Sequence, residues 1–217
     1  MKQVTNMSRL VNQLEKMFRT LNTDLFNNEL EMPIITVTPS SKSYAHYTPW
    51  DAWQAGDTQK REINIASGTL NRPLEAICAS LLHEMVHMYN DTILNIQDTS
   101  RNGTYHNKAF AAACKNHGLI CTKTEKYGWA HTIPSDDLIM WVLEHDEFRD
   151  IEMCRNDIGY MSIGVGAHSA CGGVQIITTV NKSNSRRYIC PCCHTIVRAT
   201  RTVNIICGDC MQSMIEG

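Results

Sequence analysis

Three polar residues in the stretch LLHEMVHMYN, residues 81–90, have the types and spacing of a metal-dependent hydrolytic site. In a helix, residues four positions apart lie on one face, so His83 and His87 can both direct an imidazole nitrogen at one zinc ion. Glu84 then lies beside the first ligand, where its carboxylate can take a proton from an attacking water. A lone H-E-x-x-H match also arises by chance. This one, however, lies in an otherwise apolar helix, where unpaired polar side chains would be costly.

A catalytic zinc takes three protein ligands and keeps one position open, so we expect a third ligand downstream. The metzincin pattern is excluded, because Asn90 and Ile93 stand where it requires a glycine and a histidine. The best candidate is His106, in TYHNKAF, which we expect at the start of the following helix. His117 beside Gly118 reads more as a charge at a helix end. The alternatives that stay open are His117, His131 and Glu144.

A second group of potential ligands lies near the C-terminus, in YICPCCHTIVRATRTVNIICGDC, residues 188–210. Two C-x-x-C knuckles separated by a predicted two-stranded hairpin are typical of a structural zinc ribbon, and four thiolates would leave no open coordination position. Cys192 and His194 lie next to the first knuckle, so Cys192 is an alternative ligand. The equal two-residue gaps favour the set Cys190, Cys193, Cys207 and Cys210.

The ribbon segment is locally basic. Residues 181–217 contain five basic and two acidic side chains, a formal charge of +3, whereas the whole chain carries -2. Arginines on the strands of a ribbon can track phosphates, which predicts contact with nucleic acid. The alternative is an ordinary solvated face.

Composition indicates a globular protein of one sizeable domain plus a small appendage. The 217 residues are 43% hydrophobic and 19% charged. No stretch has the roughly 18 apolar residues of a membrane span, and the N-terminus lacks the apolar region of a signal peptide. We therefore expect a cytoplasmic location, nucleoid-associated in a bacterium. In that reducing compartment the ten cysteines favour metal binding over disulfides.

The elements that must position these residues form an α+β pattern. We predict an amphipathic helix over 7–26, then a small, mainly antiparallel sheet with strands at 34–38, 44–47 and 62–66. Asn71 and Pro73 are start signals for the helix that carries the H-E-x-x-H residues to about Asn90. Further helices are expected at 106–116 and 136–147, with a loop at 95–104. The predicted organisation is a metallopeptidase domain over 1–148, a linker or extension over 149–180 and the ribbon over 181–217.

HEMVH, YHNKAF, the N-terminal LNTDLFNNEL and the four-cysteine ribbon together resemble the SprT-like zinc metallopeptidases. This family includes the Spartan proteases, which degrade proteins crosslinked to DNA, and the compact chain looks like a bacterial or phage member. The resemblance implies a zincin-like fold, with one zinc on His83, His87 and His106 and Glu84 as the base. It implies a second zinc on the four ribbon cysteines and proteolysis stimulated by DNA. We therefore expect the ribbon to bind DNA, single-stranded or at a junction.

The resulting expectation is a zinc endopeptidase that acts on DNA-associated or DNA-crosslinked proteins. Two alternatives are a nucleic-acid-binding regulatory protein with an inert peptidase domain and a peptidase of one dedicated protein regulator. Other residues are also candidates for functional roles. Trp50 and Trp53 could stack on bases, pack in the core or cover the site. His46 could border the cleft, and Tyr105 could donate to an oxyanion.

Overall fold

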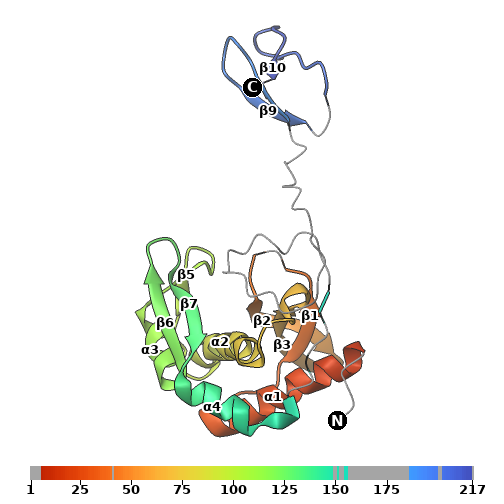
Figure 1. Cartoon of the computed structure of the whole chain (residues 1–217). Coiled ribbons are helices and arrows are strands. Elements are labelled where there is room, and N and C mark those ends of the chain that lie inside the picture. Colours follow the sequence, from red (N-terminus) through yellow and green to blue (C-terminus); the bar gives the residue numbers. More distant parts are fainter. Residues whose placement is uncertain are drawn as a thin grey trace. The chain divides into compact units, whose positions relative to one another are not determined.

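A computed structural model describes residues 6–40, 42–148, 151, 154–155, 186–199 and 202–216. The chain divides into two compact units, Met1–Gly166 (unit 1) and Ala167–Gly217 (unit 2), and each is described by itself (Figure 1). Most of the predicted linker, 149–180, lies outside the described residues. Within the described part of the chain, no helix combines the length and hydropathy of a membrane span.

The first helix, α1 (Met7–Phe26), has the predicted bounds. The Asn6 side chain caps it by accepting a hydrogen bond from the Arg9 N–H at 3.0 Å, and Asn27 ends it in the left-handed conformation at φ 52°. Apolar residues spaced three and four apart form its buried stripe, which includes Leu10, Leu14, Met17, Phe18 and Leu21.

The first sheet is mixed, so the prediction of a mainly antiparallel sheet is wrong in part. Its strands are β1 (Ile34–Thr38), β2 (Ala45–Ala55) and β3 (Thr58–Ala66), in the order β1-β3-β2. Strand β3 pairs parallel with β1 and antiparallel with β2. Both β2 and β3 extend beyond the predicted strands at 44–47 and 62–66 to form a long hairpin. Pro49 is accommodated because β2 is an edge strand whose pairing is irregular between Thr48 and Trp53.

The central helix of unit 1 is α2 (Leu74–Thr92), which lies between the two sheets in Figure 1. Pro73 occupies its N-cap without a side-chain hydrogen bond, so Asn71 does not cap the helix as predicted. Its apolar residues are buried on several sides of the helix, as expected of a helix covered by neighbours. Between β3 and α2 lies a short 3-10 turn, η1 (Ser67–Thr69).

The second sheet has the order β4-β5-β7-β6 and was largely missed by the sequence prediction. Its strands are β4 (Thr99–Ser100), β5 (Tyr105–His106), β6 (Leu119–Thr124) and β7 (Gly128–Pro134). The first two have two residues each, too short for any periodicity to be visible. The β6–β7 hairpin was not assigned, since most of its residues are exposed and show weak alternation.

Two further helices complete the described part of unit 1. Helix α3 (Lys108–Asn116) begins later than predicted, because Asn107 is its N-cap. The side-chain Oδ1 of Asn107 accepts hydrogen bonds from the Ala109 and Phe110 N–H groups. Helix α4 (Asp136–Glu144) is capped by Ser135 as predicted and is followed by the 3-10 turn η2 (Asp146–Phe148). The fold class α+β is therefore confirmed.

Unit 2 is a small three-stranded sheet with the order β10-β8-β9. Its strands are β8 (Arg186–Ile189), β9 (Ile196–Ala199) and β10 (Ile215–Glu216). The predicted hairpin between the two knuckles is wrong in part: β9 lies between them as predicted, but it pairs antiparallel with β8 across the first knuckle, and 202–205 is not a strand. The buried residues of this unit are Tyr188, Cys190, Cys207 and Met214.

Candidate metal centres

Three histidines from two elements converge in unit 1. His83 and His87 project from the same face of α2, one helical turn apart, as their spacing predicts. His106 comes from β5, not from the start of the following helix, because Asn107 caps α3 one residue later. The structure therefore brings together the three predicted residues, and it corrects the element that supplies the third.

The geometry of the three imidazoles fits a tetrahedral zinc. The Nε2 atoms of His83 and His87 are 3.2 Å apart, those of His83 and His106 are 3.2 Å apart, and those of His87 and His106 are 3.0 Å apart. With zinc–nitrogen bonds of 2.0–2.1 Å, neighbouring ligand nitrogens in a tetrahedron are about 3.3 Å apart. These three residues could hold one metal ion, and a fourth position would stay open.

Hydrogen bonds on the opposite ring nitrogens orient two of the imidazoles. The His87 Nδ1 lies 2.8 Å from the Asp98 Oδ2, and the His83 Nδ1 lies 2.9 Å from the Thr132 Oγ1 on β7. Asp98 is 7% exposed and also accepts a hydrogen bond from the Asn90 side chain at 2.8 Å. A proton on Nδ1 leaves Nε2 free to bind metal, so these partners select the tautomer that a ligand requires. Sequence reasoning missed both partners.

The aromatic ring of Phe110 packs against all three histidines. Its centroid lies 4.7 Å from that of His83, 4.4 Å from that of His87 and 4.6 Å from that of His106. Phe110 is fully buried on α3. It restricts the rotamers of the three side chains and excludes water from one side of the site. One indication of this contact was visible in the sequence, namely that Phe110 follows His106 by four residues in the YHNKAF stretch.

The position of His106 depends on a close approach between β5 and β7. His106 pairs with Gly128, and its N–H donates to the Tyr127 carbonyl at 3.0 Å. A Cβ on Gly128 would lie 2.1 Å from the His106 carbonyl oxygen, and Gly128 has φ +63°. Only glycine fits this position, because any larger residue would push away the strand that carries the third histidine.

Glu84 is buried beside the histidines, with 6% of its surface exposed. Burial raises the pKa of its carboxyl to about 7, although the electrostatic interaction with His87 and a hydrogen bond with the Tyr47 backbone act in the opposite direction. The Tyr47 hydroxyl donates to Asp91 at 2.6 Å and so ties β2 to α2 next to this carboxylate. Strand β2 therefore lies beside the residue predicted to act as the base.

Burial also keeps two of the histidines neutral. It lowers the pKa of His83 well below the usual value and the pKa of His106 to about 4, and repulsion from His87 acts in the same direction. A neutral imidazole has a free nitrogen lone pair, which is the form that binds a metal ion.

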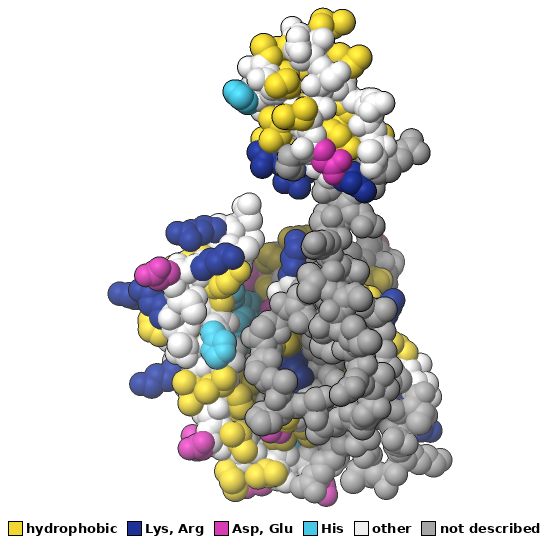
Figure 2. Space-filling model, turned by 45° about the horizontal axis from the view of Figure 1, so that its top comes forward, with side chains coloured by type: hydrophobic (Ala, Val, Ile, Leu, Met, Phe, Trp, Pro, Cys, Tyr) yellow, Lys and Arg dark blue, Asp and Glu magenta, His cyan; other side chains and the backbone are white. Residues whose placement is uncertain are grey.

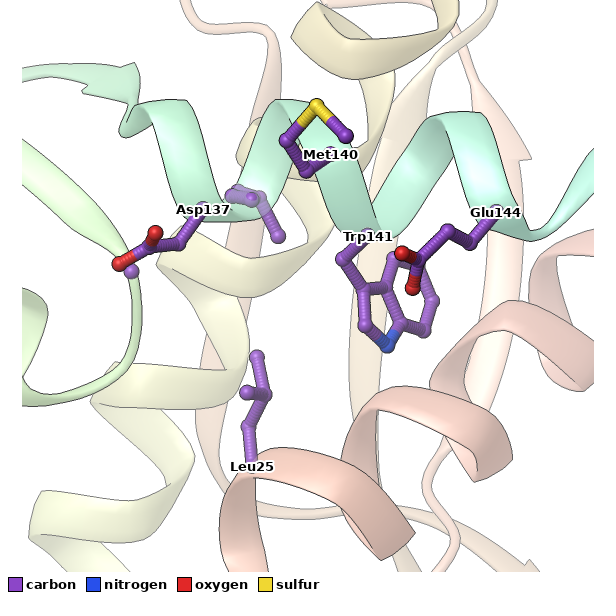
Figure 3. A pocket seen from close by; sticks show the side chains of 7 residues that line it. Leu25, Asp137, Met140, Trp141 and Glu144 are labelled. Atoms are coloured by element: carbon purple, nitrogen blue, oxygen red, sulfur yellow. The ribbon is translucent and has the colours of Figure 1, made fainter.

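The alternative third ligands lie elsewhere. His117 is buried, stacks on Phe26 at 4.2 Å and shares a 2.7 Å hydrogen bond with the Ala113 carbonyl, so it is a packing residue and not the expected charge at the helix end. His131 is exposed on β7. Glu144 belongs to a hollow between α1 and α4, lined by Leu25, Gly118, Asp137, Leu138, Met140, Trp141 and Glu144 (Figure 3).

The aromatic residues singled out in the sequence are mostly at the surface. Trp50 and Trp53 are 64% and 46% exposed on β2, and the Trp53 indole donates to Glu62 at 2.9 Å. Core packing is therefore wrong for both of them. His46 is also exposed, and Tyr105 is half-buried beside His106.

In unit 2 the four predicted cysteines form a second group that could hold a metal ion: Cys190, Cys193, Cys207 and Cys210. The Cys193 and Cys207 sulfurs are 3.6 Å apart, close to the roughly 3.8 Å expected between ligands of a tetrahedral zinc with 2.3 Å bonds. A hydrogen bond with the Thr195 hydroxyl lowers the pKa of the Cys193 thiol to about 6, which favours the thiolate form that binds zinc.

The two knuckles have the same backbone conformation. The His194 N–H donates to the Cys190 carbonyl at 3.0 Å, and the Met211 N–H donates to the Cys207 carbonyl at 2.8 Å. His194 and Met211 each have positive φ, 59° and 51°. This repeated turn directs the two cysteines of each knuckle to one point. Cys192 is exposed and is not a member of the four-cysteine group.

Comparisons with known proteins give no match: no family model, no curated protein and no solved structure is similar to this chain. The α+β fold and the two groups of potential metal ligands are therefore established from the structure alone.

Proposed function

We propose that this protein is a zinc-dependent endopeptidase that acts on DNA-associated or DNA-crosslinked proteins, with the zincin-like fold and chemistry of the SprT-like family that its sequence resembles. The observation that carries the proposal is the convergence of three Nε2 atoms within 3.2 Å of one another beside the buried carboxylate of Glu84. Three imidazole nitrogens directed at one point, an open fourth position and an adjacent carboxylate are the requirements of metal-assisted amide hydrolysis.

Each residue has a distinct role in the proposed reaction. Zinc, when bound, supplies the Lewis acidity that polarises the substrate carbonyl and activates water. Glu84 accepts the proton of the attacking water and passes it to the nitrogen of the leaving amine. Asp98 and Thr132 hold the imidazoles of His87 and His83 in the ligand tautomer. Phe110 keeps the three rings in place.

The proposed association with DNA is supported by one face of the ribbon. Arg187 and Arg198 are directly opposite on β8 and β9, and both are exposed. Like charges in that position repel each other, which a bound phosphate would relieve. The same face holds Ile189 and Ile196, whereas Arg186 pairs with Glu216 at 2.8 Å on the other face.

The test is cleavage of a histone by the full chain with and without single-stranded DNA. Wild type is compared with Glu84→Gln, which keeps the metal ligands but removes the base, and with Glu75→Gln, a control at the start of the same helix. We expect cleavage by wild type and E75Q, stimulation by DNA, and loss of at least about 100-fold in E84Q.

Other outcomes distinguish the alternatives. Cleavage that is indifferent to DNA and to Arg187→Gln/Arg198→Gln would favour a peptidase of a dedicated regulator. Equal activity in wild type and E84Q would exclude Glu84 as the base. Zinc-loaded wild type that cleaves no histone in either condition but binds DNA would favour the regulatory protein with an inert peptidase domain.

A further inference from the structure

The charge of unit 1 is divided unequally along the chain. Residues 99–134 contain five basic side chains and one acidic one, a formal charge of +4. Residues 6–98 and 135–148 contain sixteen acidic and seven basic side chains, a formal charge of -9. The basic segment includes His106 and Thr132, so positive charge is concentrated around the part of unit 1 that completes the histidine site.

The basic side chains of this segment are exposed and lack carboxylate partners among the described residues. They are Arg101, Lys108, Lys115, Lys123 and Lys126, which we call the basic surface. None of the five forms an ion pair with a carboxylate among the described residues. Elsewhere in unit 1, Lys16, Arg19, Lys60 and Arg61 each contact one. The separation of these five cations from the carboxylates of the acidic part of the unit favours an external anionic partner.

The basic surface follows connected elements. Lys123 and Lys126 lie at the tip of the β6–β7 hairpin, and Lys108 and Lys115 are seven residues apart on α3, which places them on one side of that helix. Lys108 is the first residue of α3, where the helix dipole disfavours a cation. Figure 2 shows Lys and Arg side chains gathered over this side of unit 1.

Aromatic rings lie among these cations. The Arg101 guanidinium is 4.9 Å from the centre of the Tyr105 ring, and the Lys126 ammonium is 4.9 Å from the centre of the Tyr127 ring. Tyr127 is 45% exposed at the hairpin tip. Cations that track phosphates, interleaved with rings on which bases can stack, are characteristic of surfaces that bind single-stranded nucleic acid. An acidic peptide would use the cations but would have no bases for the rings.

From this arrangement we infer that the basic surface binds single-stranded nucleic acid alongside the histidine site, as a contact separate from the ribbon. Strand β7 links the two regions directly, because its Gly128 pairs with His106 and its Thr132 hydrogen-bonds to His83. A single-stranded nucleic acid bound on the β6–β7 hairpin would therefore lie next to the histidine site. The binding does not depend on catalysis. Its role in presenting a DNA-attached protein rests on the proposed function.

The test measures binding of the full chain to fluorescently labelled oligo(dT) by anisotropy over a range of salt concentrations. Glu84→Gln is the parent protein, so that proteolysis does not affect the result. Lys123→Gln/Lys126→Gln is compared with Lys16→Gln/Lys60→Gln, which removes the same charge from two paired lysines. The slope of log Kobs against log salt is negative, and each lost phosphate contact makes it shallower by about 0.7. The slope of the hairpin variant should therefore be shallower by about 1.4.

An unchanged slope in the control, with the loss confined to the hairpin variant, would support the inference. Equal slopes in the two double variants would overturn it and leave the ribbon as the site of DNA binding. Loss of binding to labelled polyglutamate by the hairpin variant, with oligo(dT) binding intact, would overturn it in favour of an acidic peptide. Because E84Q lacks the proposed base, none of these outcomes depends on whether the protein is a peptidase.

Discussion

The Asp98 carboxylate holds His87 through a 2.8 Å contact between Oδ2 and Nδ1, and Asn90 fixes the same oxygen from one turn further along α2. Asp98 follows His87 by eleven positions, because the chain leaves α2 after Thr92 and then returns to the side of the helix that carries His87. The Asn107 N–H donates to the Asp98 carbonyl at 2.9 Å, so the same loop residue supports His87 and adjoins the strand that carries His106.

Asp98→Asn should weaken zinc binding to the histidine site by about 10- to 100-fold, because the amide is a poorer acceptor for the His87 Nδ1–H. The measurement is zinc affinity by competition with a chromophoric chelator, with the ribbon zinc as the internal reference. Asp57→Asn, at the exposed turn of the first hairpin, is the control and should bind like wild type. Equal affinities in both variants would show that Asp98 does not orient the ligand.

Gly128→Ala should displace His106 and reduce the zinc content of the histidine site. The matched control is Gly56→Ala, since Gly56 has φ +61° with no atom near the position of its Cβ, whereas Gly128 has φ +63° and meets the His106 carbonyl. The control should lose only about 1–2 kcal/mol of stability, the cost of left-handed backbone. Zinc stoichiometry and Tm check this. A similar zinc content in both variants would contradict the proposed role.

Removal of a ribbon thiol should unfold unit 2 and leave unit 1 folded. Among the described residues of the ribbon, four side chains are buried, and two of them are Cys190 and Cys207, so this apolar core alone is too small to hold the fold. Cys207→Ser should lower the zinc content from two ions to one, whereas the exposed Cys192→Ser should keep both. Loss of one zinc from C192S as well would assign Cys192 to the site.

His117 should make the protein less stable in acid. Burial lowers its pKa below the usual 6.5, so below that pH the unfolded chain takes up a proton that the native state resists. The free energy of unfolding should therefore fall as the pH drops below about 6.5, by at most about 1.4 kcal/mol per pH unit for one proton. Above that pH the contribution is fully present.

Urea unfolding of wild type and His117→Phe at about pH 7.5 and about pH 5.5 tests this expectation. Phenylalanine preserves a ring against Phe26 but cannot titrate. The difference in stability between the two pH values should be smaller in H117F, while His131→Phe, at an exposed position, should behave like wild type. The three histidines of the metal site are unchanged in all three proteins, so their contribution to the pH dependence of stability is the same in each. The same acid response in H117F and wild type would exclude His117 as its source.

The features that the sequence determined by itself depend on short-range geometry. Four-residue spacing places His83 and His87 on one helical face whatever else surrounds them. The Ser135 cap, the bounds of α1 and the paired two-residue gaps of the ribbon are local in the same way, and each was predicted correctly as a structural feature.

Only the tertiary structure decided how distant residues complete the site. The sequence favoured His106 as the third ligand but left His117, His131 and Glu144 open, and the position of His106 depends on its pairing with Gly128, 22 positions further along the sequence. Thr132, Asp98 and Phe110 reach the histidines from a strand, a loop and a helix that follow α2 along the chain. Strand partners and their register are set by long-range packing, and two-residue strands such as β5 have no periodicity to read. Local spacing could therefore predict the positions of His83, Glu84 and His87 on one helix, whereas the residues that support them depend on how the whole chain packs.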